Sequence, residues 1–363
     1  MATPFLVISV SSKIVWGSFV SVLLFSLLAL QIINWGNKEY LLRQFSQQPK
    51  NINADYSRIL ITRLPLVIVF GIVGFAYFSL PICGVLFLWI FGRFLNHSVE
   101  ALLIFEKKFN ASILIELVCF VGFAFGIYEN PNLDLFSLLL LYSLYQLIKG
   151  IWYFLLFKKN FTLKNTRIDF NYYKISFPFF LLSILGFLAS KVDVYLVDHL
   201  GDKISTANYQ IINSLLVFTM SLSAFLYAPY TKNIYRNNQA LMQKTRNLLL
   251  VIGLFVVPLA LFFIYFILKY YYVNLQLPLV FYAIAFVYIY PSFLYGIEVV
   301  NLFKLHQEKT VVRFLFIGAL ANTLFSAGFL YFNYGILGAL TGSAIAQLLV
   351  LGLFKFKLYR EKK

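Results

Sequence analysis

Eleven apolar stretches, each long enough to cross a bilayer as a helix, follow one another along this chain and decide what it can fold into. About 20 apolar residues in a helix span the roughly 30 Å hydrocarbon core of a membrane. Only 12% of the residues are charged and 61% are hydrophobic, whereas soluble domains carry roughly 25% charged residues. The sequence therefore predicts an all-α integral membrane protein. The expected spans are approximately 14–35, 59–80, 82–104, 111–128, 134–157, 175–198, 206–229, 247–268, 276–301, 311–331 and 334–355.

The basic residues concentrate in every second connection between these spans. Basic connections face the cytoplasm in most membrane proteins, so one side of the membrane is expected to hold all of them together with the C-terminus. The connections on the other side, such as "YENPNLD" at 128–134 and "FNYG" at 332–335, are short and nearly free of Lys and Arg. The basic residues that set this orientation are Lys38, Arg43, Lys50, Arg58, Lys107, Lys108, Lys158, Lys159, Lys164, Arg167, Lys174, Lys232, Arg236, Lys244, Arg246, Lys304, Lys309, Arg313, Lys355, Lys357, Arg360, Lys362 and Lys363.

The distribution of charge and cysteine excludes several function classes. The net charge of +16 could indicate a nucleic-acid partner, but its placement between apolar runs is typical of membrane orientation instead. Cys83 and Cys119 lie in apolar runs and form no CxxC pair, and the three histidines are scattered, so no metal site is expected. No Walker loop, GxSxG or HExxH motif occurs, so no cofactor-dependent or hydrolytic enzyme is expected.

The arrangement of the spans predicts two helical bundles. Residues 4–12, "PFLVISVSS", are apolar but too short to cross a membrane, and we expect them to be the remnant of a truncated first helix in a twelve-helix fold. The long basic stretch 158–174 then separates an N-terminal bundle, residues 1–160, from a C-terminal bundle, residues 161–363. Transporters are often built from two such repeats with the substrate site near their interface.

Among the charged residues within the expected spans, five are candidates for a site: Arg93, Glu116, Lys191, Asp193 and Glu298, whereas Arg63 and Glu100 lie nearer span ends. A Lys, Arg or Asp at the bilayer centre costs about 2.5–3.5 kcal/mol on insertion scales, so such a residue is expected to face a cavity or a partner. Lys191 and Asp193 are two residues apart and do not share a helix face, so they are not expected to pair with each other. Lys191 could also snorkel to the interface.

Three segments carry a family pattern. In residues 11–46, Gly17 and Gly36 flank an apolar helix that is followed by a short basic amphipathic segment. In "SKVDVYLVDHLGDKISTANYQIINSLL" (190–216), a basic residue precedes an Asp by two positions, and a Gly and a Tyr follow. The last span, "YGILGALTGSAIAQLLV" (334–350), is rich in small residues. In this order they resemble the Wzx-type O-antigen and polysaccharide flippases of the MOP superfamily, over nearly the whole chain.

The resemblance implies a flippase that moves undecaprenyl-pyrophosphate-linked oligosaccharide, an O-antigen or capsule repeat unit, from the inner to the outer leaflet by alternating access. It implies a multi-pass protein of the bacterial cytoplasmic (inner) membrane, surrounded by membrane lipids, that is not an enzyme. Polysaccharide polymerase and glycosyltransferases would be its partners in polysaccharide or lipopolysaccharide biosynthesis.

With this cargo, the charged residues within the spans acquire expected roles. Arg93, Lys191 and Asp193 would line the substrate cavity, with Arg93 and Lys191 contacting the anionic headgroup. Glu116, Asp193 and Glu298 could bind a coupling proton or Na⁺. Equally, Glu116 and Glu298 could neutralise Arg93 or Lys191.

Two other functions remain open. A multidrug exporter of the MATE type, from the same superfamily, would carry organic cations, and a cavity containing Arg and Lys argues against that cargo. A membrane-embedded polysaccharide polymerase would present a long outer loop, whereas every outer loop expected here is short.

The charge pattern yields a test of topology. Single cysteines placed in 36–58, 158–174, 230–246 and the C-terminal tail should react with a membrane-impermeant reagent only after the cells are opened, because basic connections are retained in the cytoplasm. Labelling of a cysteine in 230–246 from outside intact cells would reverse the orientation.

Overall fold

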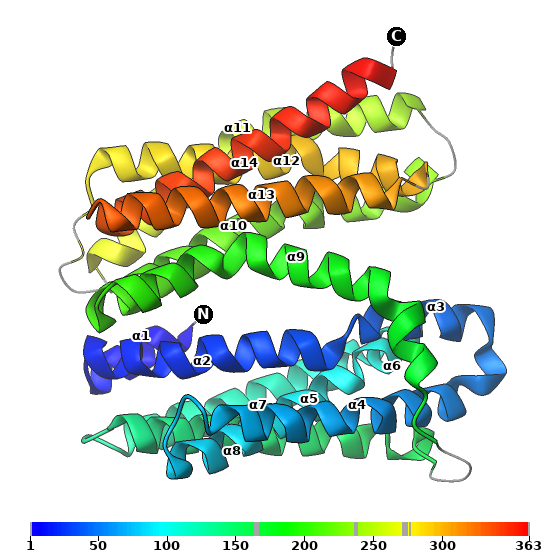
Figure 1. Cartoon of the computed structure of the whole chain (residues 1–363), viewed down its shortest axis with the longest axis vertical. Helices are drawn as coiled ribbons and strands as arrows, with labels where there is room; N and C mark the ends of the chain where they lie inside the picture. The colour runs from blue at the N-terminus through cyan, green and yellow to red at the C-terminus, as the bar shows by residue number, and fades with distance from the viewer. Residues whose placement is uncertain are drawn as a thin grey trace. The chain divides into compact units, whose positions relative to one another are not determined.

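The structure, a computed structural model, describes residues 2–162, 167–235, 239–270, 275, 277–305 and 307–361 (Figure 1). Of the basic residues that set the expected orientation, Lys164, Arg236, Lys362 and Lys363 lie outside these ranges. All regular secondary structure in the described ranges is helical.

Among the described residues, eleven helices are long and apolar enough to cross a membrane, which confirms the predicted all-α membrane fold. Each expected span falls on one of them, although several helices extend well past the expected ends. Their bounds are α2 Lys13–Asn34, α4 Ile52–Gly74, α5 Leu80–Ser98, α7 Phe109–Tyr128, α8 Leu135–Leu156, α9 Phe170–Leu200, α10 Lys203–Tyr235, α11 Gln239–Tyr270, α12 Leu279–Lys304, α13 Glu308–Tyr331 and α14 Gly335–Glu361.

Three shorter helices accompany them: α1 Ala2–Val10, α3 Asn37–Gln47 and α6 Glu100–Phe105. The expected amphipathic segment is α3, which buries Leu41 and Phe45 while its basic side chains remain exposed. Between α2 and α3 the chain turns through Gly36, whose φ of +66° lies in the left-handed region that glycine adopts without strain.

The described chain divides into two compact units, called here the N-terminal unit, Leu6–Ile184, and the C-terminal unit, Met1–Phe5 with Leu185–Lys363. The division falls within α9, a continuous helix of 31 residues that belongs to both units. The boundary expected at 160/161 remains a prediction about domain organisation.

In the N-terminal unit, α5 and α8 approach each other most closely at two glycines. A Cβ added to Gly92 would lie 2.5 Å from the Gln146 carbonyl oxygen, and one added to Gly150 would lie 2.0 Å from the Gly92 carbonyl oxygen. Small residues of this kind let membrane helices pack backbone against backbone. The contact also determines the positions of the charged neighbours of these glycines, Arg93 on α5 and Lys149 on α8.

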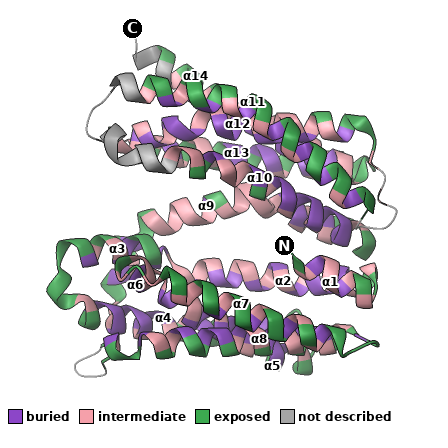
Figure 2. Ribbon diagram, turned by 180° about the vertical axis from the view of Figure 1, so that it is seen from behind, coloured by how far each residue is buried: buried purple, intermediate pink, exposed green. Residues whose placement is uncertain are grey.

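In the C-terminal unit, α12 packs against α10, α11 and α14, and α13 pairs with α14. Buried residues follow the sides of these helices that meet their neighbours, while large apolar side chains such as Phe255 and Phe262 are exposed (Figure 2). Exposed apolar side chains are expected where helices face lipid. A second close glycine contact joins α13 and α14, since a Cβ on Gly342 would lie 2.4 Å from the Ser326 nitrogen.

Gly92→Ala should lower the stability of the protein by about 1–3 kcal/mol, because the added methyl group meets backbone that cannot move aside. The matched control is Gly84→Ala on the same helix, where nothing lies within 4 Å of the added Cβ. That change should be neutral or stabilising, by up to about 1 kcal/mol. Thermal unfolding of the detergent-solubilised variants measures both, and equal melting temperatures would contradict the close approach.

Candidate functional site

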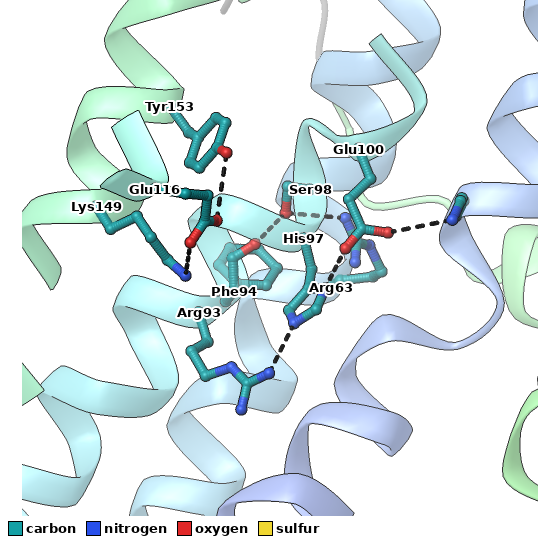
Figure 3. A network of polar contacts seen from close by, with 10 residues as sticks. Arg63, Arg93, Phe94, His97, Ser98, Glu100, Glu116, Lys149 and Tyr153 are labelled. Carbon is teal, nitrogen blue, oxygen red and sulfur yellow. Dashed lines mark hydrogen bonds and ion pairs between the residues drawn. The ribbon is translucent and has the colours of Figure 1, made fainter. Parts of the chain in front are cut away.

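A row of polar side chains in the N-terminal unit begins at Arg93. Arg93 Nη2 lies 3.4 Å from His97 Nε2, and His97 Nδ1 lies 2.5 Å from Glu100 Oε1 (Figure 3). The second oxygen of Glu100 is 4.0 Å from the Lys38 ammonium on α3. Arg93 and His97 are four residues apart on one face of α5, and Glu100 follows at the start of α6. His97 therefore links the cation to the carboxylate.

A second group of charges joins α7 to α8. Lys149 Nζ lies 3.1 Å from Glu116 Oε2, and the Tyr153 hydroxyl donates to Glu116 Oε1 at 3.3 Å (Figure 3). Ser112 and Tyr153 share a hydrogen bond of 2.6 Å between their hydroxyls. Glu116 is thus held by an ammonium and a phenol from the same neighbouring helix.

The two groups line one cavity. A pocket of about 300 Å³ is bounded by Glu100 and Glu116 together with Lys38, Asn96, Ser112 and Tyr153. A polar space of this size has room for several water molecules. Both carboxylates of the N-terminal unit's network can therefore stay hydrated within a spanning bundle.

Arg63 on α4 is the most deeply buried cation of this unit, with no exposed surface. Its Nη2 donates to Ser98 Oγ at 3.1 Å, and its guanidinium lies 5.3 Å from the centre of the Phe94 ring. Contact with an aromatic face stabilises a desolvated cation.

A charged contact at the end of the same unit lies outside the spans. Burial alone would raise the pKa of Glu106, but Lys108 at 2.8 Å and the Asn160 amide at 3.1 Å donate to its carboxylate. The net effect holds the pKa of Glu106 below its ordinary value, so this contact stays ionised near neutral pH.

Asp193 in the C-terminal unit is fully buried and ties helices together. Its Oδ2 accepts hydrogen bonds from the Tyr209 hydroxyl at 2.6 Å, from Ser343 Oγ at 2.8 Å and from the Asn213 amide at 3.3 Å. These donors come from α10 and α14, whereas Asp193 belongs to α9. A carboxylate enclosed in this way is not positioned to touch a large substrate.

Lys191 contacts Asp193 through an intervening side chain. Its Nζ donates to Asn213 Oδ1 at 2.7 Å. The same Asn213 donates through Nδ2 to Asp193, so one amide bridges the cation and the carboxylate. Lys191 is half-buried, and its strongest contact is therefore with a neutral group.

Further oxygens surround the buried carboxylate. Asn322 Oδ1 lies 3.0 Å from Ser343 Oγ and 2.8 Å from Ser326 Oγ, and the Ala339 carbonyl oxygen lies 3.0 Å from Ser326 Oγ. One carboxylate with hydroxyl, amide and carbonyl oxygens is a donor set that suits a hard cation. In the part of the chain that the structure describes, no three His, Cys, Asp or Glu side chains gather as transition-metal ligands would.

Glu298 on α12 pairs with Arg246 at the start of α11. Arg246 Nε donates to Glu298 Oε1 at 2.6 Å, and Nη2 contacts the same oxygen. Glu298 has 3% of its surface exposed, so breaking the pair would remove a cation from a buried carboxylate.

The structure places the five expected residues in four groups: Arg93 with His97, Glu116 with Lys149, Lys191 and Asp193 with Asn213, and Glu298 with Arg246. Glu116 and Glu298 each pair with a cation, which is one of the two alternatives proposed for them. The cations differ from the expected Arg93 and Lys191: they are Lys149 for Glu116 and Arg246 for Glu298. Sequence reasoning missed Lys149, although its position in the apolar run "YQLIKGIW" is the same signal that marked Arg93. It also missed His97, whose spacing from Arg93 and Glu100 was visible.

Comparison with known proteins shows the fold of the chain. No protein-family model and no curated protein matches the sequence significantly. A solved structure described as "Lipid II flippase MurJ, inward closed conformation" superposes with a TM-score of 0.75 at 13% identity, covering 98% of this chain and 85% of that one. An inward-facing multidrug resistance MATE family transporter of the MOP superfamily superposes with a TM-score of 0.66 at 11% identity, covering 99% and 94%. At such identities the likeness establishes the MOP-type fold alone.

The Glu116–Lys149 pair should show strong energetic coupling. Glu116→Gln and Lys149→Gln should each destabilise the protein, while the double variant should lose less than their sum, with a coupling of about 1–3 kcal/mol. The control pair is Asp198 and Lys203 at a helix connection, 3.0 Å apart, where the lysine side chain is 44% exposed against 10% for Lys149 and the coupling should stay below about 1 kcal/mol. Unfolding in mixed detergent micelles measures both cycles. Additive effects at Glu116 and Lys149 would show that the contact contributes nothing.

Proposed function

We propose that this protein is a flippase that moves undecaprenyl-pyrophosphate-linked oligosaccharide, an O-antigen or capsule repeat unit, across the bacterial cytoplasmic membrane by alternating access. The observation that carries the proposal is the superposition of 98% of the chain on a lipid II flippase with a TM-score of 0.75. The family-like segments at 11–46, 190–216 and 334–350 support the narrower choice of an oligosaccharide cargo.

The cargo presents an anionic headgroup, which cannot enter hydrocarbon without compensation. Three cations within the spans have neutral rather than carboxylate neighbours: Arg93 beside His97, Lys191 beside Asn213 and Arg63 beside Ser98. Arg63 has no exposed surface, so it is not accessible to a substrate. Lys149 and Arg246, in contrast, are already paired with carboxylates. We therefore assign headgroup contact to Arg93, whose planar fork suits phosphate oxygens, and to Lys191, which acts as a point charge.

We assign ion coupling to Asp193 in preference to Glu116 and Glu298. The oxygens of Ser343, Asn322 and Ser326 gather around or next to its carboxylate, and such a group can accept a proton or Na⁺. Glu116 and Glu298 each hold a cation from an adjacent helix, which is a sufficient structural role. With the cell interior negative, outward movement of the anionic cargo is favoured by about 2.3 kcal/mol per charge per 100 mV, so no ATP is required.

This assignment puts the C-terminus in the cytoplasm and makes glycosyltransferases and a polysaccharide polymerase the functional partners. A MATE-type cation exporter is the second candidate, because a transporter of that family superposes on 99% of the chain with a TM-score of 0.66. Arg93 and Lys191 would repel an organic cation, which favours the flippase.

Arg93→Gln and Lys191→Gln should each reduce flipping at least about tenfold, since a hydrogen bond to a charged group contributes about 1.5–3 kcal/mol. The measurements are surface polysaccharide in a flippase-deficient strain and movement of the lipid-linked oligosaccharide in proteoliposomes. Arg43→Gln and Lys269→Gln remove equivalent charges at exposed positions and should leave the rate unchanged.

The same variants separate the two candidates. Export of organic cations by the wild type, with undiminished export by Arg93→Gln and Lys191→Gln, would support the MATE-type activity and overturn the flippase proposal. Wild-type flipping rates in both variants would remove these two residues from the headgroup site.

A further inference from the structure

The C-terminal unit contains a groove that neither the transport proposal nor the Asp193 group uses. It has a volume of about 560 Å³ and lies between α11, α12 and α14. Arg246 near the start of α11, Glu298 near the end of α12 and Lys355 near the end of α14 line it, so it opens at the end of the bundle where these three termini meet. We propose that this groove binds the phosphate headgroup of an anionic membrane lipid.

The charged part of the groove is built to hold an anion. Arg246 is oriented by Glu298 Oε1, 2.6 Å from its Nε, and by Gln243 Oε1, 3.0 Å from its Nη1. Because Arg246 is already paired with Glu298, the net positive charge comes from Lys355, which lines the same groove from a different helix. The Arg246 guanidinium contributes the N–H donors that Glu298 and Gln243 do not use. Two cations and one carboxylate leave this group of three side chains with a net charge of +1. Basic pockets between membrane helices at the cytoplasmic side are typical headgroup sites.

The remaining lining favours a lipid over a soluble phosphate compound. Leu250, Leu294 and Leu351 form apolar walls. Tyr295 and Phe354 stack face to face with ring centres 5.4 Å apart, and the Tyr295 hydroxyl donates a hydrogen bond to Gln347 Oε1 at 2.8 Å. A ligand that fills this space needs a charged end near Arg246 and Lys355 and an apolar body along the leucines. A phospholipid has that form, whereas inorganic phosphate and most soluble phosphates do not.

Two neighbouring lysines provide a matched control for testing the site. Lys244 and Lys357 lie two residues from Arg246 and Lys355 on the same helices, but they do not line the groove. General attraction of anionic lipid to this end of the protein would involve all four cations, whereas the proposed site depends on only two. The lipid site is independent of what the protein transports.

The test uses the full-length protein in detergent and counts bound lipids by native mass spectrometry. The probes are phosphatidylglycerol and phosphatidylcholine with identical acyl chains. Wild type should retain one phosphatidylglycerol in preference to phosphatidylcholine. Arg246→Gln/Lys355→Gln should weaken this binding by about fivefold for each cation removed, and Lys244→Gln/Lys357→Gln should leave it unchanged.

Arg246→Gln removes the cation that pairs with the buried Glu298, so the double variant can lose stability. A single Lys355→Gln variant with wild-type melting temperature gives a test that does not depend on that stability. It should show the fivefold loss alone. Equal loss in both double variants would reduce the effect to general surface charge and overturn the proposal. Retention of phosphatidylcholine as strong as that of phosphatidylglycerol would do the same. Displacement of the bound lipid by millimolar inorganic phosphate would assign the cations to a soluble ligand and overturn the lipid assignment.

Discussion

Charge within a membrane-spanning bundle needs a partner in the bundle, and this requirement organises the polar interior of the protein. Each carboxylate within the spans discussed above has a partner from another helix: Lys149 for Glu116, Arg246 for Glu298, and hydroxyl and amide donors for Asp193. The polar contacts therefore specify which helices are neighbours. Apolar surface alone cannot do so in a bilayer, because lipid tails are as apolar as the helix surfaces. Arg93 and Lys191, the partly exposed cations with neutral neighbours, stand out against this background.

Close backbone approach and polar pairing occur side by side. Gly92 comes directly before Arg93, and Gly150 comes directly after Lys149. In the same way, Gly342 comes directly before Ser343. Where two helices nearly touch, adjacent side chains are displaced to the edges of the contact and reach into the next gap between helices. The glycines thus bring α5 to α8 and α13 to α14. The same contacts also set the positions of the polar side chains next to them, Arg93, Lys149 and Ser343.

The sequence predicted the spans well because a span depends on local composition, and local composition is fully visible. It predicted the separation of Lys191 from Asp193 for the same reason, since helical spacing decides it. The partners could not be predicted. Ser343 meets Asp193 across 150 positions, and Lys149 meets Glu116 from a different helix. Which helices lie together depends on packing between helices. The residues next to a given position in the sequence do not indicate that packing.

The division of α9 between two compact units has a mechanical consequence. Its first part is fastened by Trp35, which stacks on Phe180 at 4.0 Å between ring centres, and its last part is fastened by Asp193. Between these anchors the connection is helix rather than loop, with open space around Gly186, and Pro178 removes one backbone donor just before the first anchor. Because the chain crosses from one unit to the other as a helix, its backbone has far fewer conformations at this point than a flexible linker would have.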